Sequence, residues 1–139
     1  MHRVMLSLFL CGVVSICPLL SHAQADSAAV NRGRYLVDHV AQCGDCHTPR
    51  VAGVPDKTRW LKGSMLGFQP MQPIPGWMPS APDITRTSIV WKSWGDKALV
   101  HFFMTGLRPD GKPAAPPMPA FSLTSQDARA VVAYLKSLP

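Results

Sequence analysis

The sequence predicts a small helical domain in which long proline-rich loops join the helices. Three segments place apolar residues at helical spacing, and no segment alternates between apolar and polar residues as a half-buried strand does. The connections between these segments hold most of the 14 prolines, which remove amide donors and disrupt regular helix. We therefore expect one domain of the helical class with irregular connections.

Residues 1–25 have the layout of a secretory signal peptide. Arg3 precedes an apolar run from Val4 to Leu20, and Ala23 and Ala25 occupy the small positions of an A-x-A cleavage site. We expect cleavage after Ala25, which leaves one domain of residues 26–139, exported to the periplasm.

Other readings of this segment stay open. The alternatives are cleavage after Ala23, an uncleaved membrane anchor and a lipidated cysteine. Pro18 and the small residues after it favour cleavage over an anchor. Cys11 and Cys17 follow large apolar residues, which does not suit lipidation.

The first predicted helix covers residues 27–42. Its apolar stripe consists of Val30, Gly33, Val37 and Val40.

The second predicted helix covers residues 93–106. Ser93 is the predicted N-cap with Asp96 three residues on, and Gly106 is the predicted C-terminal stop. Its apolar face consists of Leu99, Phe102, Phe103 and Leu107.

The third predicted helix covers residues 124–139. Thr124 and Asp127 suggest a capping pair at its start. Its apolar face consists of Ala128, Val131, Val132, Leu135 and Leu138.

Three short helices give a thin core for a domain of this length. The loops nevertheless contain large apolar residues, which argue against disorder. These residues are Trp60, Leu61, Phe68, Trp77 and Ile84. Small domains often make up such a deficit with a metal, disulfides or a cofactor. A large, flat, apolar cofactor would give the tryptophans and loops a surface to pack on.

The segment Cys-Gly-Asp-Cys-His at residues 43–47 indicates which cofactor. C-x-x-C-H is the attachment signature of c-type haem. Residues three apart on a helical turn face the same way, so Cys43 and Cys46 can each form a thioether to one vinyl group of a single haem. His47 follows directly and can reach the iron as an axial ligand. We therefore expect one covalently bound haem c.

Two competing readings of the cysteine pair are weaker. A thioredoxin-like pair calls for a preceding strand and a parallel sheet, whereas a helix precedes Cys43. A structural zinc site needs four ligands, and His39 and His101 lack metal-ligand spacing.

The sixth position of the iron has several candidate ligands. They are Met65, Met71, Met78, Met104, Met118, His39 and His101. Met118 is favoured because prolines on both sides stiffen its loop and because it lies far along the chain from His47. Met78 also precedes a proline and is the main competitor, whereas Met104 lies on a predicted helix and is expected in the core.

The sequence resembles the class I cytochrome c family over essentially all of residues 26–139. "NRGRYLVDHVAQCGDCHT" is similar to its N-terminal helix and haem motif, and "APPMPAFSLTSQDARAVVAYLKSLP" to its methionine loop and C-terminal helix. The segments "RWLKGSMLGFQP", "SAPDIT" and "TGLRPDGKPAAPPMP" resemble the cytochromes that accompany bacterial periplasmic dehydrogenases.

The resemblance implies an all-α cytochrome c fold in which the N- and C-terminal helices cross. Gly33 and Tyr35 would lie at that crossing, near Tyr134 and Leu135. The family often has Asn-Ile-Thr where this chain has Asp83, so a hydrogen bond made by that asparagine is in question. In open-site four-helix cytochromes the haem motif lies near the C-terminus, whereas here it lies near the start, which favours a closed site.

The expected function is therefore single-electron transfer by a periplasmic monohaem cytochrome with His47/Met118 ligation, not enzymatic catalysis. Its expected partners are a dehydrogenase donor and a respiratory acceptor, a cytochrome or an oxidase. The alternatives are a subunit of a larger dehydrogenase complex and an open-site haem enzyme or sensor. Without Arg3 the chain keeps 13 of its 14 Lys and Arg residues against 8 Asp, an excess that suits an acidic partner but is too scattered to indicate nucleic-acid binding.

Overall fold

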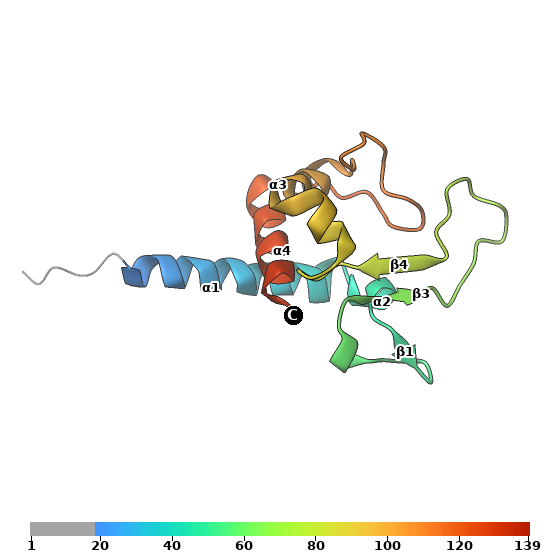
Figure 1. Ribbon diagram of the computed structural model, residues 1–139, viewed down its shortest axis with the longest axis horizontal. Coiled ribbons are helices and arrows are strands. Elements are labelled where there is room, and N and C mark those ends of the chain that lie inside the picture. Colours follow the sequence, from blue (N-terminus) through green and yellow to red (C-terminus); the bar gives the residue numbers. More distant parts are fainter. Residues whose placement is uncertain (1–18) are drawn as a thin grey trace, which may run out of the picture.

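The computed structural model describes the backbone of residues 19–139 and the side chains from residue 26 onward (Figure 1). Most of the predicted signal peptide, with Arg3 and the side chains of Ala23 and Ala25, lies outside these described residues. Its cleavage therefore stays a prediction. Within the described part of the chain, no helix is both long and apolar enough to cross a membrane.

Helix α1 (Leu19–Tyr35) begins before the predicted start near Ser27 and continues into the π-helical turn η1 (Leu36–Val40). The Ala41 amide donates to the Leu36 carbonyl five residues earlier, at 2.8 Å. The wider turn shifts the residues after it around the helix axis. Leu36 and Val37 are buried, whereas Val40 is 58% exposed, so the prediction that Val40 joins the apolar stripe is wrong.

Helix α3 (Ile89–Thr105) begins earlier than predicted. Its N-cap is Ser88, whose hydroxyl accepts from the Trp91 amide at 3.1 Å, and not Ser93. The backbone leaves helical geometry at Gly95 (φ 70°, ψ 174°), and this kink separates a first short segment from the predicted one. Gly106 ends the helix in the left-handed conformation that glycine favours, as predicted.

The predicted apolar face of α3 is confirmed in part. Leu99, Phe102 and Phe103 are buried, and the rings of Phe102 and Phe103 lie 5.5 Å apart in an edge-on contact. Leu107 follows the helix and is 39% exposed.

Helix α4 (Ser125–Ser137) agrees with its prediction. The Thr124 hydroxyl accepts from the Asp127 amide at 3.1 Å. Four of the five predicted stripe residues are buried and Leu138 is partly buried against the core; the buried ones are Ala128, Val131, Val132 and Leu135.

Helices α1 and α4 cross at Gly33, as expected (Figure 1). A Cβ on Gly33 would lie 1.9 Å from the Ala130 carbonyl oxygen and 2.8 Å from the Tyr134 Cβ, so only glycine allows the backbones to approach so closely. Arg32 adds a two-pronged ion pair, with Nε 2.8 Å from Asp127 Oδ1. Tyr35, by contrast, is half-exposed, and its ring lies against His39 and Arg32 of its own helical segment.

The sequence predicts no strand, but the described residues contain four short ones, so this expectation is wrong. β1 (Arg50–Val51) pairs with β2 (Val54–Pro55), and β3 (Lys62–Met65) pairs with β4 (Ser80–Asp83), both antiparallel. The β3–β4 register sets Lys62 opposite Asp83 and Met65 opposite Ser80. Ladders of two and four residues are too short to show a period-two pattern in the sequence.

The remaining elements are the short helix α2 (Gly44–His47) and the 3-10 turn η2 (Lys57–Arg59). Figure 1 shows the crossed α1 and α4 with α3 beside them, while the β3–β4 connection and the α3–α4 connection both project from the other end of the molecule. The two proline-rich segments are not helical, as predicted.

We predict that Gly33→Ala destabilises the protein, because the added methyl group meets the rigid backbone of α4. Overpacking of this kind lowers the free energy of unfolding by about 1–3 kcal/mol. Denaturant unfolding measures the change. Gly67→Ala is the control, since a Cβ there meets nothing within 4 Å; equal stability of the two variants would contradict the close crossing.

Candidate functional site

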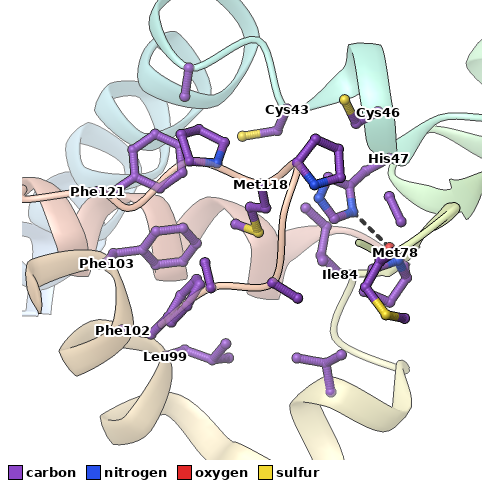
Figure 2. Close-up of a pocket in the computed structure, with 18 of the residues that line it drawn as sticks. Cys43, Cys46, His47, Met78, Ile84, Leu99, Phe102, Phe103, Met118 and Phe121 are labelled. Atoms are coloured by element: carbon purple, nitrogen blue, oxygen red, sulfur yellow. Dashed lines mark hydrogen bonds between the residues drawn. The ribbon is translucent and has the colours of Figure 1, made fainter. Parts of the chain in front are cut away.

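A cavity of about 310 Å³ opens between α2, β4, α3 and the α3–α4 connection (Figure 2). Its volume falls in the range of small-molecule and cofactor sites. Most of its wall is apolar and aromatic, including Ile84, Val90, Trp91, Trp94, Leu99, Phe102, Phe103, Phe121 and Leu135.

The two cysteines of the C-x-x-C-H motif line one wall of this cavity. The His47 amide donates to the Cys43 carbonyl at 2.9 Å, so the motif forms one helical turn, as its spacing predicts. Both thiols are free, and burial raises the pKa of the Cys43 thiol to about 11. The cysteines therefore do not form a disulfide and are available for thioether bonds.

Gly44 allows this turn to pack against Trp60. A Cβ on Gly44 would lie 2.1 Å from the Trp60 Cη2 atom. The indole Nε1 of Trp60 donates to the Tyr134 hydroxyl at 3.3 Å, and the Lys57 ammonium lies 4.0 Å from the ring centroid. Trp60 thus links the haem motif to α4. The sequence did not reveal this role, because Gly44, Trp60 and Tyr134 are distant along the chain.

His47 is 5% exposed and its Nδ1 lies 2.7 Å from the Pro82 carbonyl oxygen (Figure 2). A carbonyl can only accept, so Nδ1 carries the proton and Nε2 keeps its lone pair. Burial lowers the pKa of His47, although the Pro82 carbonyl and the charge of Asp83 act in the opposite direction. A neutral imidazole with one ring nitrogen fixed is the form that binds metals.

Asp83 caps the turn after β4. Its Oδ1 accepts from the Thr85 amide at 2.7 Å and from the Thr85 hydroxyl at 2.8 Å. An asparagine side-chain oxygen can accept the same bonds. Asp83 in place of the family's asparagine therefore preserves this turn and adds a negative charge near His47.

Met118 lines the same cavity and comes from the α3–α4 connection. Figure 2 shows its side chain near the middle of the view, between the phenylalanine rings and His47. The Met118 amide donates to the Ala115 carbonyl at 3.1 Å, which closes a tight turn in the proline-rich loop.

Met78 lines the cavity too, so the structure brings both favoured methionines to one site. Its amide donates to the Pro116 carbonyl at 2.8 Å, which joins the two methionine-bearing loops. Met78 is 48% exposed, whereas Met118 packs against the core. The other candidate ligands do not line the cavity: Met65, Met71, His39 and His101 are exposed, and Met104 packs against the core.

Arg108 lies at the cavity, where its Nη2 atom is 3.3 Å from Asp110 Oδ2 and its buried Nε atom has no hydrogen-bond partner. A buried donor without a partner is costly, so an anionic group in the cavity would stabilise it. Haem carries two carboxylate arms, so the apolar lining of this cavity and the position of Arg108 suit haem.

The two rival readings of the cysteine pair find no support. Among residues 26–139, no group of three or more His, Cys, Asp or Glu side chains is arranged to hold a metal ion. The sheets of the described chain are antiparallel pairs, and none is the parallel sheet of a thioredoxin-like site.

Residues 30–139 match the family model of cytochrome c. The chain belongs to the cytochrome c family. Membership implies covalently bound haem c and a role in electron transfer, and it agrees with the helical fold around the cavity.

Similar proteins include larger cytochromes. The chain is 37% identical over 114 residues to a diheme cytochrome c-type protein of Cereibacter sphaeroides, covering 78% of this chain and 35% of that protein. It is 36% identical to the fructose dehydrogenase cytochrome subunit of Gluconobacter japonicus, covering 78% and 22%. It is 33% identical to the cytochrome c subunit of a quinone alcohol dehydrogenase of Gluconobacter oxydans, covering 79% and 24%. The chain thus spans about a third or less of these relatives.

We predict that Thr48→Val destabilises the protein, because the Thr48 hydroxyl accepts from the buried Leu61 amide at 3.1 Å. Valine keeps the shape but leaves that amide unpaired, at a cost of about 1–3 kcal/mol. Thr48→Ser keeps the acceptor and serves as the control in thermal unfolding. If valine and serine cost the same, the hydrogen bond does not hold the haem motif to Leu61.

Proposed function

We propose that this chain is a monohaem cytochrome c that passes single electrons, with His47 and Met118 as the two axial ligands of the iron. The observation that carries the proposal is that Cys43, Cys46, His47 and Met118 all line the same cavity. One C-x-x-C-H motif is present in the sequence, which supports one haem in these residues.

Each of these side chains has a distinct proposed task. When bound, haem supplies an iron that gains and loses one electron. Cys43 and Cys46 would hold the haem by thioether bonds, and His47 would offer Nε2 to the iron because its Nδ1 donates to the Pro82 carbonyl. Arg108 pairs with a haem carboxylate through its buried Nε.

Met118 would supply the second protein ligand to the iron, beside His47. A methionine ligand raises the reduction potential, and the apolar wall around the cavity acts in the same direction. Filling both axial positions with protein side chains also excludes small ligands. Met78 is the weaker candidate because its side chain is 48% exposed.

We propose export to the periplasm, with residues 1–25 as a cleaved signal peptide and residues 26–139 as the functional domain. Haem attachment of the c type takes place outside the cytoplasm, so the haem motif and the apolar leader support each other. The mass of the exported protein tests the cleavage site after Ala25.

The proposed donor is a dehydrogenase and the proposed acceptor is a respiratory cytochrome or oxidase. Support comes from the three relatives described above, two of which are named as cytochrome subunits of dehydrogenases. Because those relatives are several times longer than this chain, service as part of a larger dehydrogenase complex is equally compatible with the electron-transfer role.

We predict that Met118→Ala removes the weak far-red iron–sulfur band of the ferric protein and lowers the reduction potential, because the iron loses its thioether ligand. The reduced variant then binds carbon monoxide rapidly, and the parent does not. Absorption spectra and a redox titration measure these changes.

Met78→Ala is the matched control, since it removes a methionine from the same cavity. It is expected to keep the band and the potential. Loss of the band in Met78→Ala alone would assign the ligand to Met78, and rapid carbon monoxide binding by the parent would favour an open-site enzyme or sensor.

A further inference from the structure

The connection between β3 and β4 exposes an unusual number of apolar side chains. Five of the eleven large exposed apolar residues in the described chain lie between residues 65 and 78. They are Met65, Phe68, Met71, Ile74 and Met78, and Met71 is 100% exposed. Apolar residues scattered singly on a surface are ordinary, but this number on one loop is typical of a contact surface.

This loop also lacks charge. No Asp, Glu, Lys, Arg or His occurs between Lys62 and Asp83, although 14 Lys and Arg and 8 Asp are spread through the rest of the chain. The centres of protein interfaces are depleted in charged residues and enriched in methionine and aromatic residues. The composition of the loop matches such a centre.

Both ends of the loop reach the haem cavity. Leu66 and Met78 line the cavity, and the Leu66 amide donates to the Pro79 carbonyl at 2.9 Å, which closes the base of the loop. The Met78 amide bonds to Pro116, two residues before Met118. A protein seated on this loop therefore lies next to the cofactor site, and Figure 1 shows the loop projecting freely from that end of the molecule.

We propose that the loop of residues 65–78 is the docking surface for a redox partner protein whose own contact face is apolar and uncharged. This inference rests on the proposed electron-transfer function, because only a partner that exchanges electrons needs to sit beside the haem. A charged partner face would have to leave its charges unpaired against the loop, which costs free energy. Flexible methionines suit the loop to such contacts, since they adapt to the shape of the partner surface.

Electron self-exchange between oxidised and reduced copies of the exported holoprotein tests the proposal. A second copy presents the same apolar loop, so it serves as the probe of an uncharged partner face. Line broadening of the haem resonances in mixtures of the two oxidation states gives the rate. We expect Met71→Lys to lower this rate by about tenfold or more, because two buried ammonium groups would face each other.

The control is Val54→Lys, which adds the same charge at a 66% exposed position on the β1–β2 hairpin. Its self-exchange rate is expected to stay within about twofold of the parent, and Met71→Leu is expected to keep the parent rate. Equal losses for Met71→Lys and Val54→Lys, or no loss in Met71→Lys, would overturn the docking surface.

Measurements on the same three proteins distinguish a wrong docking surface from a wrong proposed function. The haem spectrum, the reduction potential and the rate of reduction by ascorbate are expected to be equal in parent, Met71→Lys and Val54→Lys. A parent protein without covalent haem or without a reversible one-electron couple would refute the proposed function instead, whatever the self-exchange rates of the loop variants.

Discussion

The hydrogen bond from His47 Nδ1 to the Pro82 carbonyl is the constraint on which the site depends. It joins α2, which contains Cys46 and has Cys43 as its N-cap residue, to β4, which follows the long β3–β4 connection. It fixes one tautomer of a nearly buried imidazole, and burial itself disfavours the charged form. The remaining ring nitrogen is thereby kept ready for a metal, and the strand that holds it also holds the base of the exposed loop in place.

The helical frame provides the support for this arrangement. Close approach of α1 and α4 at Gly33 brings Tyr134 within reach of Trp60, and Trp60 in turn packs on Gly44 inside the haem motif. Leu99, Phe102 and Phe103 of α3 belong to the buried core and also line the cavity. A cofactor bound in the cavity would add apolar contacts to these side chains, which suits a small domain with few helices and long loops.

The sequence predicted the features that depend on local pattern. The apolar face of α4, its Thr124 cap and the Gly106 stop are encoded in adjacent residues, and the C-x-x-C-H turn places Cys43 and His47 through a local hydrogen bond. The predicted apolar stripe fails at Val40 because a π-helical turn has no sequence signature. Ser88 was missed as the cap of α3 because the kink at Gly95 hides the start of the helix. The short strands, the Trp60–Gly44 packing and the Arg108 donor depend on contacts between distant residues, which periodicity does not reveal.

Covalent attachment of haem is tested most directly by the intact mass of the denatured protein. For this measurement the protein is expressed with its own N-terminal segment in a periplasm that attaches c-type haem. We expect the mass of residues 26–139 plus one haem, because thioether bonds at Cys43 and Cys46 survive denaturation. Replacing both cysteines with serine is expected to leave the polypeptide mass alone. A parent protein that carries no haem after denaturation would contradict covalent attachment and, with it, the assignment of this site.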